Sequence, residues 1–380
     1  MEISGTHNMS SPFKVGFIVE PYEESEASGM GYSVLETAKA LALHAGPYAL
    51  TLYSSRPLNP QLVPGFYHNV IVPKSLAGKF FRFLLMKKEV DVLFFVVPLL
   101  PLWIPKKIRT VAICKELTDH KLKSHGIRAR SIVFIRDKLL MPVCMARAVR
   151  VLASSEATVR DVVQFYGVHK ECIEVISEGY QDWTRFAAKA PPLDENVRPY
   201  FLFTGKVKSR KNVHGIIAAF ISLKERIHSN CKLLIAGSYG GEYYASLASE
   251  LKKHHLEQDV HFLGYVSAPM MYTLYVNALA LVFPSFNEGF GMPLVEAMSL
   301  KLPIISSNIS SLAEVTGDAG LLVDPYDTEA ISEAMERILG DQNLKRDLVE
   351  KGLKRAKLFS WEKVGEKYSA VIHKFQTHVL

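Results

Sequence analysis

Short apolar runs alternate with amphipathic stretches along most of the chain. The first run is KVGFIV (14–19), and a glycine-bearing loop separates it from an amphipathic helix predicted from about Val34 to Leu43. Apolar strands that alternate with helices are typical of a parallel sheet covered on both faces. The alternation stops at KAPPLDENVRP (189–199), whose three prolines and four charged residues indicate a linker.

The strand and helix alternation restarts after this linker with YFLFTG (200–205) and continues to AGLLVDP (319–325). The sequence therefore predicts two consecutive doubly wound α/β domains, which suits a length of 380 residues. Open parallel sheets bind ligands beyond the carboxyl ends of their strands, so two facing sheets are expected to enclose one deep cleft.

The stretch FNEGFGMPLVEAM (286–298) joins an apolar strand to a helix in an unusual way. Pro293 suits the first helical position, and the N–H groups of Leu294 and Val295 are then expected to be free. Free N–H groups at a helix start attract phosphate, and the neighbouring glycines let a ligand approach the backbone. A phosphate site is predicted here.

Two glutamates, Glu288 and Glu296, stand eight residues apart across this loop and helix. Carboxylates accept hydrogen bonds from vicinal hydroxyls, which sugars supply in pairs, so the stretch predicts a sugar-nucleotide site. Taken alone, Glu296 has an equally simple interpretation, because acidic residues in a first turn commonly compensate the helix dipole. The complete string E-G-F-G-x-P-x-x-E is far more specific.

This string resembles the E-x7-E signature of glycosyltransferase family 4, the retaining nucleotide-sugar transferases with the GT-B fold. Further likeness is found in FTGKVKSRKN (203–212), LASSEATVRDVVQFYGV (152–168) and FSWEKVGEKYSAVI (359–372). The resemblance implies two Rossmann-like domains that face each other across a deep cleft. It implies an acceptor domain of residues 1–193, completed by a returning helix at about 361–380, and a donor domain of residues 194–360.

The resemblance also assigns roles to the signature: Glu288 would contact the hydroxyls of the donor sugar, and Glu296 those of the ribose. The remaining donor-binding residues that it implies are Gly289, Phe290 and Gly291 for the sugar, Leu294 and Val295 for the diphosphate, Tyr265 and Val266 for the base, Gly205 and Arg210 in the cationic loop, and Gly29 and Gly31 near phosphate and acceptor. Two glycines alone are weak evidence, and a simple tight turn around Gly29 and Gly31 is the stronger interpretation of that motif by itself.

Two lysines, Lys206 and Lys211, complete the implied catalytic set with Glu288. Lys206 stands where the family usually has arginine, and an ammonium group still neutralises phosphate although it lacks the bidentate fork. Such cations stabilise a nucleoside diphosphate as its charge grows. The chain has no Asp-x-Asp pair, and the resemblance implies neither metal nor cofactor; the expected donor is a UDP- or GDP-linked sugar.

The chain departs from the family after the strand RTVAIC (109–114), where His-Asp is common and Lys115-Glu116 stands here. Asp119-His120 follows in reversed order. Lys115 could reach a hydroxyl or a phosphate, and an ion pair with Glu116 or another neighbour is an equally good interpretation. A second departure is Glu178, in place of the family's asparagine, and its role is open.

The net charge of +7 is concentrated in one region, since residues 74–150 hold 17 Lys and Arg against 5 Asp and Glu. A solvated helix face, an anionic membrane surface and nucleic acid are the three interpretations. No nucleic-acid module is recognisable, so no nucleic-acid partner is expected. The four cysteines are scattered without a metal or redox spacing, and residues 1–13 lack an apolar signal core, so we expect a cytosolic protein, in peripheral contact with the inner face of a membrane under the second interpretation.

The function expected from the sequence is transfer of a hexose from a nucleotide sugar to a saccharide or lipid-linked acceptor, with retention and without metal. Lys115-Glu116 in place of His-Asp motivates an alternative, a catalytically silent protein of the same fold that binds sugar nucleotides. A GT-B epimerase or phosphorylase is a third hypothesis, and a phosphorylase would need a pyridoxal lysine context that is not recognisable.

Overall fold

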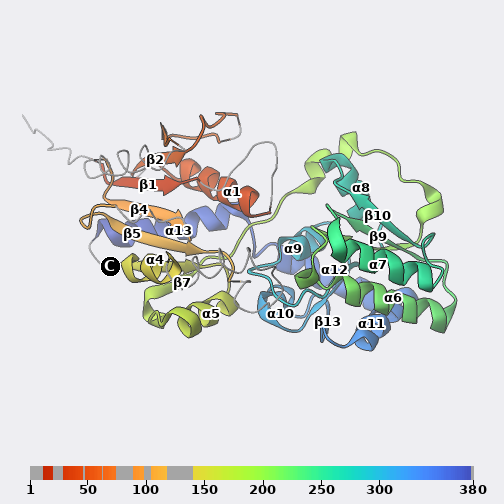
Figure 1. Cartoon of the computed structure of the whole chain (residues 1–380). Coiled ribbons are helices and arrows are strands. Elements are labelled where there is room, and N and C mark those ends of the chain that lie inside the picture. The colour runs from red at the N-terminus through yellow and green to blue at the C-terminus, as the bar shows by residue number, and fades with distance from the viewer. Residues whose placement is uncertain are drawn as a thin grey trace, which may run out of the picture.

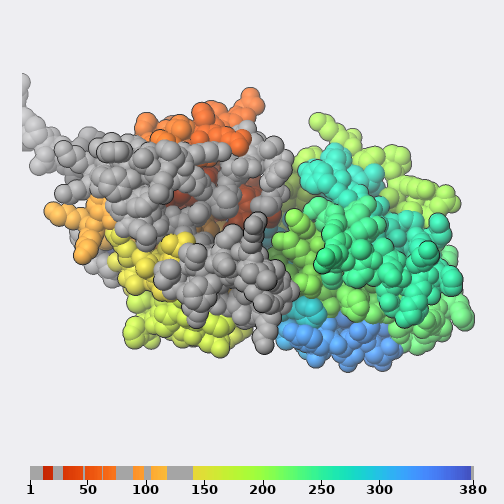
Figure 2. All heavy atoms as spheres, viewed as in Figure 1, coloured from red at the N-terminus to blue at the C-terminus, as the bar shows by residue number. Residues whose placement is uncertain are grey.

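The computed structural model describes residues 12–19, 29–45, 48–61, 63–73, 89–97, 104–117 and 140–377. Within these residues the chain forms two parallel β-sheets, each flanked by helices (Figure 1). The two sheets belong to two lobes that meet side by side, the first mainly orange and yellow and the second green to blue (Figure 2). The predicted α/β class with two doubly wound domains is confirmed.

The first sheet has the strand order β3-β2-β1-β4-β5-β6-β7 in the described part of the chain, and every neighbouring pair is parallel. Its strands are β1 (Lys14–Ile18), β2 (Ala49–Ser54), β3 (His68–Ile71), β4 (Val92–Val96), β5 (Arg109–Cys114), β6 (Arg150–Ala153) and β7 (Ile173–Val175). Its helices are α1 (Gly29–Leu43), α4 (Met141–Arg147), α5 (Glu156–Tyr166) and α13 (Trp361–Gln376). The order reverses between β1 and β4.

The second sheet repeats this plan with the order β10-β9-β8-β11-β12-β13 and parallel pairs throughout. Its strands are β8 (Tyr200–Thr204), β9 (Lys232–Ala236), β10 (Val260–Gly264), β11 (Leu281–Phe283), β12 (Ile304–Ser307) and β13 (Leu321–Val323). Its helices are α6 (Val213–Ile227), α7 (Gly241–Lys253), α8 (Ala268–Asn277), α9 (Met292–Ser299), α10 (Ser310–Thr316), α11 (Thr328–Gly340) and α12 (Gln342–Ala356). Here the order reverses between β8 and β11, which is where open sheets bind ligands.

Burial on both faces explains why the strands are nearly continuous apolar runs. All five residues of β4 are buried, as are all five of β8. The first core gathers around Phe17 and Phe94, and the second around Phe203 and Phe283, whose rings stack with centroids 5.8 Å apart. A sheet with helices on both sides needs this pattern, which is why periodicity alone identified the fold class.

The chain crosses between the lobes twice. It leaves the first sheet after β7 through the 3-10 helices η4 (Trp183–Lys189) and η5 (Glu195–Val197); η5 lies within the predicted linker 189–199, whereas η4 precedes the linker and overlaps it only at Lys189. It returns through α13, which packs on α1, and Tyr368 and Phe375 of α13 are fully buried in the first core (Figure 1). The division into an acceptor domain of residues 1–193 with about 361–380 and a donor domain of residues 194–360 stays a proposal. The two crossings of the chain are consistent with it.

One helix boundary predicted from the sequence needs correction. The helix predicted from Val34 begins at Gly29, so Gly29 and Gly31 lie in its first turn and not in a loop. Residues 74–88 and 118–139, which carry most of the basic charge, lie outside the described residues. No helix in the described ranges has both the length and the apolar character to cross a membrane.

Gly179, which follows β7, packs against Trp361 at the start of α13. A Cβ atom added to this buried residue would lie 2.6 Å from the ring of Trp361, the first residue of α13. We therefore predict that Gly179→Ala lowers the free energy of unfolding by about 1–3 kcal/mol, the usual cost of overpacking. Urea titration followed by circular dichroism measures this change.

Gly340→Ala is the matched control, because a Cβ atom at the end of α11 would meet nothing within 4 Å. Its unfolding midpoint should equal that of the wild type or lie slightly above it, since alanine favours helix. Equal midpoints for Gly179→Ala and Gly340→Ala would show that the two crossings do not pack as described.

Candidate active site

The signature stretch forms a loop from Pro284 to Gly291 followed by α9, at the reversal point of the second sheet. Gly291 precedes the helix in a left-handed conformation with φ of 101°, and Pro293, predicted at the first helical position, is the second residue of α9. The prediction of a free N–H at Leu294 is wrong. This N–H donates to the Gly291 carbonyl at 3.0 Å, because the first turn is tight. For Val295 a free N–H stays a prediction.

Glu288 is the centre of a buried charge cluster. Its Oε1 lies 2.8 Å from Nζ of Lys211, and its Oε2 lies 3.1 Å from Nη1 of Arg210. Only 9% of Glu288 is exposed. Burial acts against ionisation of this carboxylate, but the two cations outweigh burial and lower the pKa of Glu288 below its ordinary value. Glu288 is therefore held as an ionised acceptor.

The cations come from the turn that follows β8. Gly205 has a φ of 123°, and the stem of Lys211 passes 3.4 Å from where its Cβ would be. The 3-10 helix η6 (Ser209–Lys211) then leads to Asn212, whose side chain caps α6 by accepting from the Gly215 N–H. The Asn212 amide also donates to the carbonyl of Pro284, so it fixes the cationic turn against the signature loop.

Lys206 lies apart from this cluster. It is exposed, and the structure gives its ammonium group no hydrogen bond or ion pair with a described residue. The second cation beside Glu288 is Arg210, which also donates to the Asn287 carbonyl at 3.2 Å. The sequence assigned Lys206 and Lys211 to the donor diphosphate, and that role stays a prediction for both; in the described chain, Lys211 and Arg210 are the cations that contact Glu288.

Glu296 occupies a different environment from Glu288. Its Oε2 accepts a hydrogen bond from the Tyr275 hydroxyl at 2.8 Å, and only 8% of the residue is exposed. Burial raises the pKa of Glu296 above its ordinary value, and the Tyr275 hydrogen bond offsets only part of this effect. No cation pairs with it among the described residues. The two signature glutamates therefore differ in charge environment, with only Glu288 held by cations.

The glycines of the signature bring the loop against the first domain. A Cβ atom on Gly289 would lie 1.9 Å from the carbonyl oxygen of Lys115, so only glycine fits. The Ser154 hydroxyl lies 2.7 Å from the carbonyl oxygens of both Gly289 and Lys115 and can donate to either. Phe290 between the glycines is buried, with its ring 5.3 Å from that of Phe359.

The start of α1 faces the start of α9 across the same junction. The Cβ position of Gly29 lies 3.5 Å from the methyl carbon of Met292, and Gly31, two positions further along, is buried. The amino ends of two helices, one from each domain, therefore meet beside the signature loop. Both glycines are helical, and the proximity to phosphate and acceptor that the resemblance implies for them stays a prediction.

Tyr265 and Val266, expected near the nucleotide base, follow β10 at its carboxyl end. Tyr265 is 88% exposed and Val266 is partly buried. Nearby, Tyr239 packs its ring against Tyr244 at 4.5 Å and lies 3.9 Å from the Cβ position of Gly264. An aromatic surface thus borders the predicted base position.

Lys115 does not pair with Glu116. Its Nζ lies 2.7 Å from Oε1 of Glu178 and 3.4 Å from the hydroxyl of Thr37, and the side chains of Lys115 and Glu178 are 8% and 7% exposed. Ser33 of α1 donates to the other oxygen of Glu178. Lys115 and Glu178, two of the residues at which the sequence departs from the family pattern, are therefore partners of one another, buried beneath α1.

Glu116 instead reaches the second domain. Its Oε2 lies 3.7 Å from Nη2 of Arg210, so Arg210 is placed between Glu116 and Glu288. Asp119 and His120, the alternative to the family's His-Asp, lie outside the described residues. A charged chain of Glu116, Arg210, Glu288 and Lys211 thus spans the domain junction.

Several supporting residues escaped the sequence analysis. Ser310 and Ser311 of α10 both donate to the Glu288 carbonyl, at 2.9 and 2.7 Å. Tyr275 holds Glu296, and Asn212 joins the two loops. Only Asn212 had a recognisable signal, because asparagine just before an apolar helical run is typical of a helix cap.

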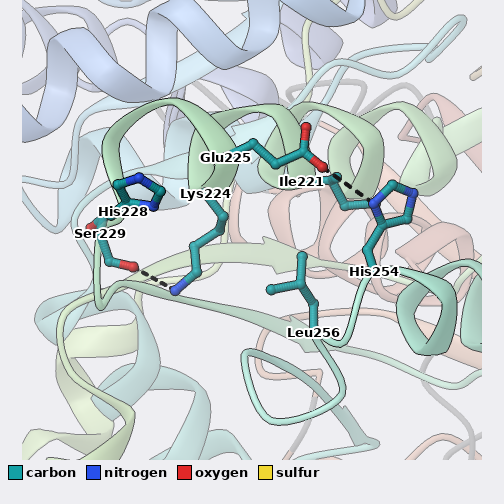
Figure 3. Close-up of a pocket in the computed structure, with 7 residues that line it drawn as sticks. All are labelled: Ile221, Lys224, Glu225, His228, Ser229, His254 and Leu256. Atoms are coloured by element: carbon teal, nitrogen blue, oxygen red, sulfur yellow. Dashed lines mark hydrogen bonds and ion pairs between the residues drawn. The ribbon is translucent and has the colours of Figure 1, made fainter.

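Two cavities in the described part of the chain lie away from these residues. One of about 430 Å³ is bordered by Lys224, Glu225, His228 and His254 at the carboxyl end of α6 (Figure 3). Because α6 has 15 residues, its two ends are roughly 22 Å apart, so this cavity is remote from Lys211. A second cavity, of about 420 Å³, lies beside α12. Within the described ranges no group of three or more His, Cys, Asp or Glu is arranged to hold a metal ion.

The buried pair of Lys115 and Glu178 generates a stability prediction. Lys115→Met or Glu178→Gln alone leaves one buried group without its partner, so each should lower the free energy of unfolding by about 3–5 kcal/mol. The double variant should lose much less than the sum of the two, because neither charge is then stranded. Urea unfolding of the four proteins measures the coupling.

The matched control is the exposed pair of Lys351 and Asp347 on α12, whose Nζ and Oδ2 lie 2.6 Å apart. Lys351→Met and Asp347→Asn should unfold close to the wild-type midpoint, because exposed pairs contribute little. If Lys115→Met behaves like these controls, the pair beneath α1 does not carry the stability assigned to it.

Comparison with known sequences identifies the second domain. Residues 185–355 match the model of the family described as glycosyl transferases group 1. O-antigen chain mannosyltransferase B of Escherichia coli is 39% identical over 163 residues, which are 43% of this chain and 42% of that protein. O-antigen chain mannosyltransferase RfbU of Salmonella typhimurium is 32% identical over 224 residues, 58% of this chain and 60% of that protein. The chain thus spans about half the length of these relatives.

The whole chain is similar in fold to sucrose-phosphate synthase from Thermosynechococcus elongatus, with a TM-score of 0.72, 20% sequence identity and coverage of 97% of this chain and 100% of that chain. This likeness extends over both sheets and confirms the GT-B architecture expected from the sequence. The signature glutamates, the cationic turn and α9 all lie inside the matched family region. Residues 185–355 of this chain therefore belong to the family of glycosyl transferases group 1.

Proposed function

We propose that the chain transfers a hexose, with mannose favoured, from a nucleoside-diphosphate sugar to a saccharide or lipid-linked acceptor, with retention of configuration. The observation that carries the proposal is the buried carboxylate of Glu288 between Lys211 and Arg210, beside the start of α9. Mannose and a polysaccharide acceptor are favoured because the relatives named above are O-antigen chain mannosyltransferases. GDP-mannose is therefore the first donor to test, ahead of UDP-linked sugars.

The cations explain how the leaving group is stabilised. The bond between C1 of the sugar and the diphosphate oxygen breaks, and negative charge grows on the diphosphate. Lys211 and Arg210 lie close enough to share this charge with Glu288, and the start of α9 adds positive partial charge. These groups would supply the stabilisation that a divalent metal supplies elsewhere, so we propose a metal-independent reaction.

The carboxylates explain how the donor is oriented. Glu288, kept ionised by its cations, accepts hydrogen bonds from sugar hydroxyls, and Glu296 accepts from the ribose. The acceptor hydroxyl then bonds to C1 on the face that the diphosphate leaves, and its proton passes to a diphosphate oxygen. The products are the extended glycan and the nucleoside diphosphate. No separate general base is required by this sequence of events.

The acceptor side rests on the first domain. The starts of α1 and α9 face one another, so an acceptor held by the first domain would meet a donor held by the second. A lipid-linked acceptor would bring the basic stretch 74–150 close to an anionic membrane surface, which lysine and arginine favour. Contact with the inner face of a membrane, from a cytoplasmic location, is part of the proposal for that class of acceptor.

A silent sugar-nucleotide-binding protein is the second candidate function. The observation that favours it is the engagement of Lys115 with Glu178, because a lysine held in a buried pair does not replace a donor-positioning histidine. The same donor site would then bind without turnover. Isothermal titration with GDP-mannose, followed by an assay for released GDP, separates the two functions.

The first functional prediction concerns Glu288. Purified protein with GDP-mannose and a mannose-containing oligosaccharide should release GDP, equally with and without EDTA. Glu288→Gln should lower kcat/KM on the order of 10²–10³-fold, the usual cost of losing one electrostatic group of an active site. The control is Glu333→Gln, an exposed residue of α11. Equal rates for Glu288→Gln and wild type would overturn the assignment of this site.

The second prediction separates the two lysines. Lys211→Met removes the ammonium group 2.8 Å from Glu288, so we expect a loss in kcat on the order of a hundredfold. Lys206→Met removes an exposed ammonium group and should change kcat by only a few-fold, since exposed charges are screened. A loss with Lys206→Met that matches the loss with Lys211→Met would show that Lys206 moves onto the donor.

A further inference from the structure

The first turn of α5, in the first domain, is completed by a residue of the second domain. Ser155 caps this helix in the ordinary way, its hydroxyl accepting from the Thr158 N–H at 3.1 Å. The N–H groups of Glu156 and Ala157 instead donate to the carboxylate of Glu314 in α10, at 3.0–3.1 Å and 3.4 Å. These two helical N–H groups have no partner within α5, so their hydrogen bonds depend on the other domain.

The contact is electrostatically favourable. A helix start carries positive partial charge, and a carboxylate placed on it forms charge-assisted hydrogen bonds. The backbone of Glu314 is fixed within the second domain, because Arg355 of α12 donates to the carbonyls of Glu314 and Val315. Glu314 is thus a fixed anion of the second domain directed at a helix start of the first.

Helix α10 also supports the loop that carries Glu288. Ser310 and Ser311 bind the Glu288 carbonyl, and Ser310 accepts from the Glu288 N–H at 3.1 Å. Residues three apart lie on the same face of a helix, so Ser311 and Glu314 share one face of α10. One short helix therefore contacts both the signature loop and the first domain.

The turn that Glu314 binds touches the signature loop as well. Ser154, two residues before Glu156, has its hydroxyl 2.7 Å from the Gly289 carbonyl oxygen. The β6–α5 turn, the signature loop and α10 thus contact one another in all three pairs. Separation of the domains would break the two contacts that the β6–α5 turn makes with the second domain, at Gly289 and at Glu314.

We propose that Glu314 is an interdomain clasp that couples closure of the two domains to the placement of the Glu288 loop. It is a positioning residue, since it acts through α10 and the β6–α5 turn. Its catalytic consequence rests on the proposed transferase function, whereas its mechanical role does not. Loss of the clasp favours the separated domains, so fewer molecules hold the first domain against a bound donor.

The mechanical role is tested first, without any sugar nucleotide. Small-angle X-ray scattering of Glu314→Ala should give a larger radius of gyration than the wild type, and Glu314→Gln, which keeps one acceptor oxygen, an intermediate value. Glu333→Ala, also on the second domain but on the exposed side of α11, is the control and should match the wild type. A Glu314→Ala protein as compact as the wild type overturns the clasp.

The coupling is tested by kinetics with GDP-mannose and the oligosaccharide acceptor. Glu314→Ala should lower kcat on the order of tenfold, the effect of removing a carboxylate from a partly buried helix start, with a smaller change in KM for the donor. Addition of salt should weaken the clasp of the wild type and leave Glu314→Ala less affected. A larger radius of gyration with unchanged kcat overturns the coupling, because closure would then not limit turnover.

The two tests fail separately. If the wild type turns over no sugar nucleotide, the transferase proposal fails while scattering still decides whether the clasp exists. If Glu314→Ala does not fold, Glu314→Gln carries the test, because it preserves the side-chain volume and removes the charge. Wild-type compactness and kcat in Glu314→Gln would then overturn the proposal.

Discussion

The burial of the Glu288 carboxylate is the constraint on which the site depends. Burial acts against ionisation of this carboxylate, which is 9% exposed, and the counter-charges that keep it ionised come from Lys211, 77 residues earlier in the sequence, and its neighbour Arg210. The two segments can meet because β8 and β11 are neighbours in the second sheet, on either side of the point where its order reverses. The charge cluster is thus a consequence of sheet topology: the reversal point is the one place where the turn after β8 and the loop after β11 adjoin.

The sequence predicted the architecture well because the strands are buried on both faces. Runs such as VLFFV in β4 have no polar alternation, and only a covered parallel sheet requires that pattern. The start of α1 was less predictable, since Gly29 and Gly31 have the composition of a loop although they begin a helix. The Cβ position of Gly29 lies 3.5 Å from the methyl carbon of Met292 in the other domain, an ordinary contact distance, and contacts with another domain leave no trace in local propensity.

The candidate site was predictable to the extent that its chemistry is local. The spacing of Glu288 and Glu296, with Pro293 between them, located the helix start from one stretch of sequence. The choice of Arg210 over Lys206 as the second cation was not predictable, because the 3-10 helix η6 determines which side chains of the basic turn face Glu288. The engagement of the Leu294 N–H likewise depends on the tightness of one turn, which composition does not specify.

The two departures from the family pattern are best understood as a single change. A lysine at position 115 would be a buried unpaired cation beneath α1, and a glutamate at position 178 a buried unpaired anion, each costly alone. Together they neutralise one another across 63 residues of sequence, with Ser33 and Thr37 satisfying their remaining hydrogen bonds. The side chain of Lys115 points inward to this pair, and its carbonyl oxygen lies against Gly289. The neighbouring side chain, Glu116, reaches Arg210. The first domain therefore approaches the Glu288 loop through a carboxylate and a backbone carbonyl, with the carboxylate of Glu116 beside Arg210, one of the two cations that hold Glu288.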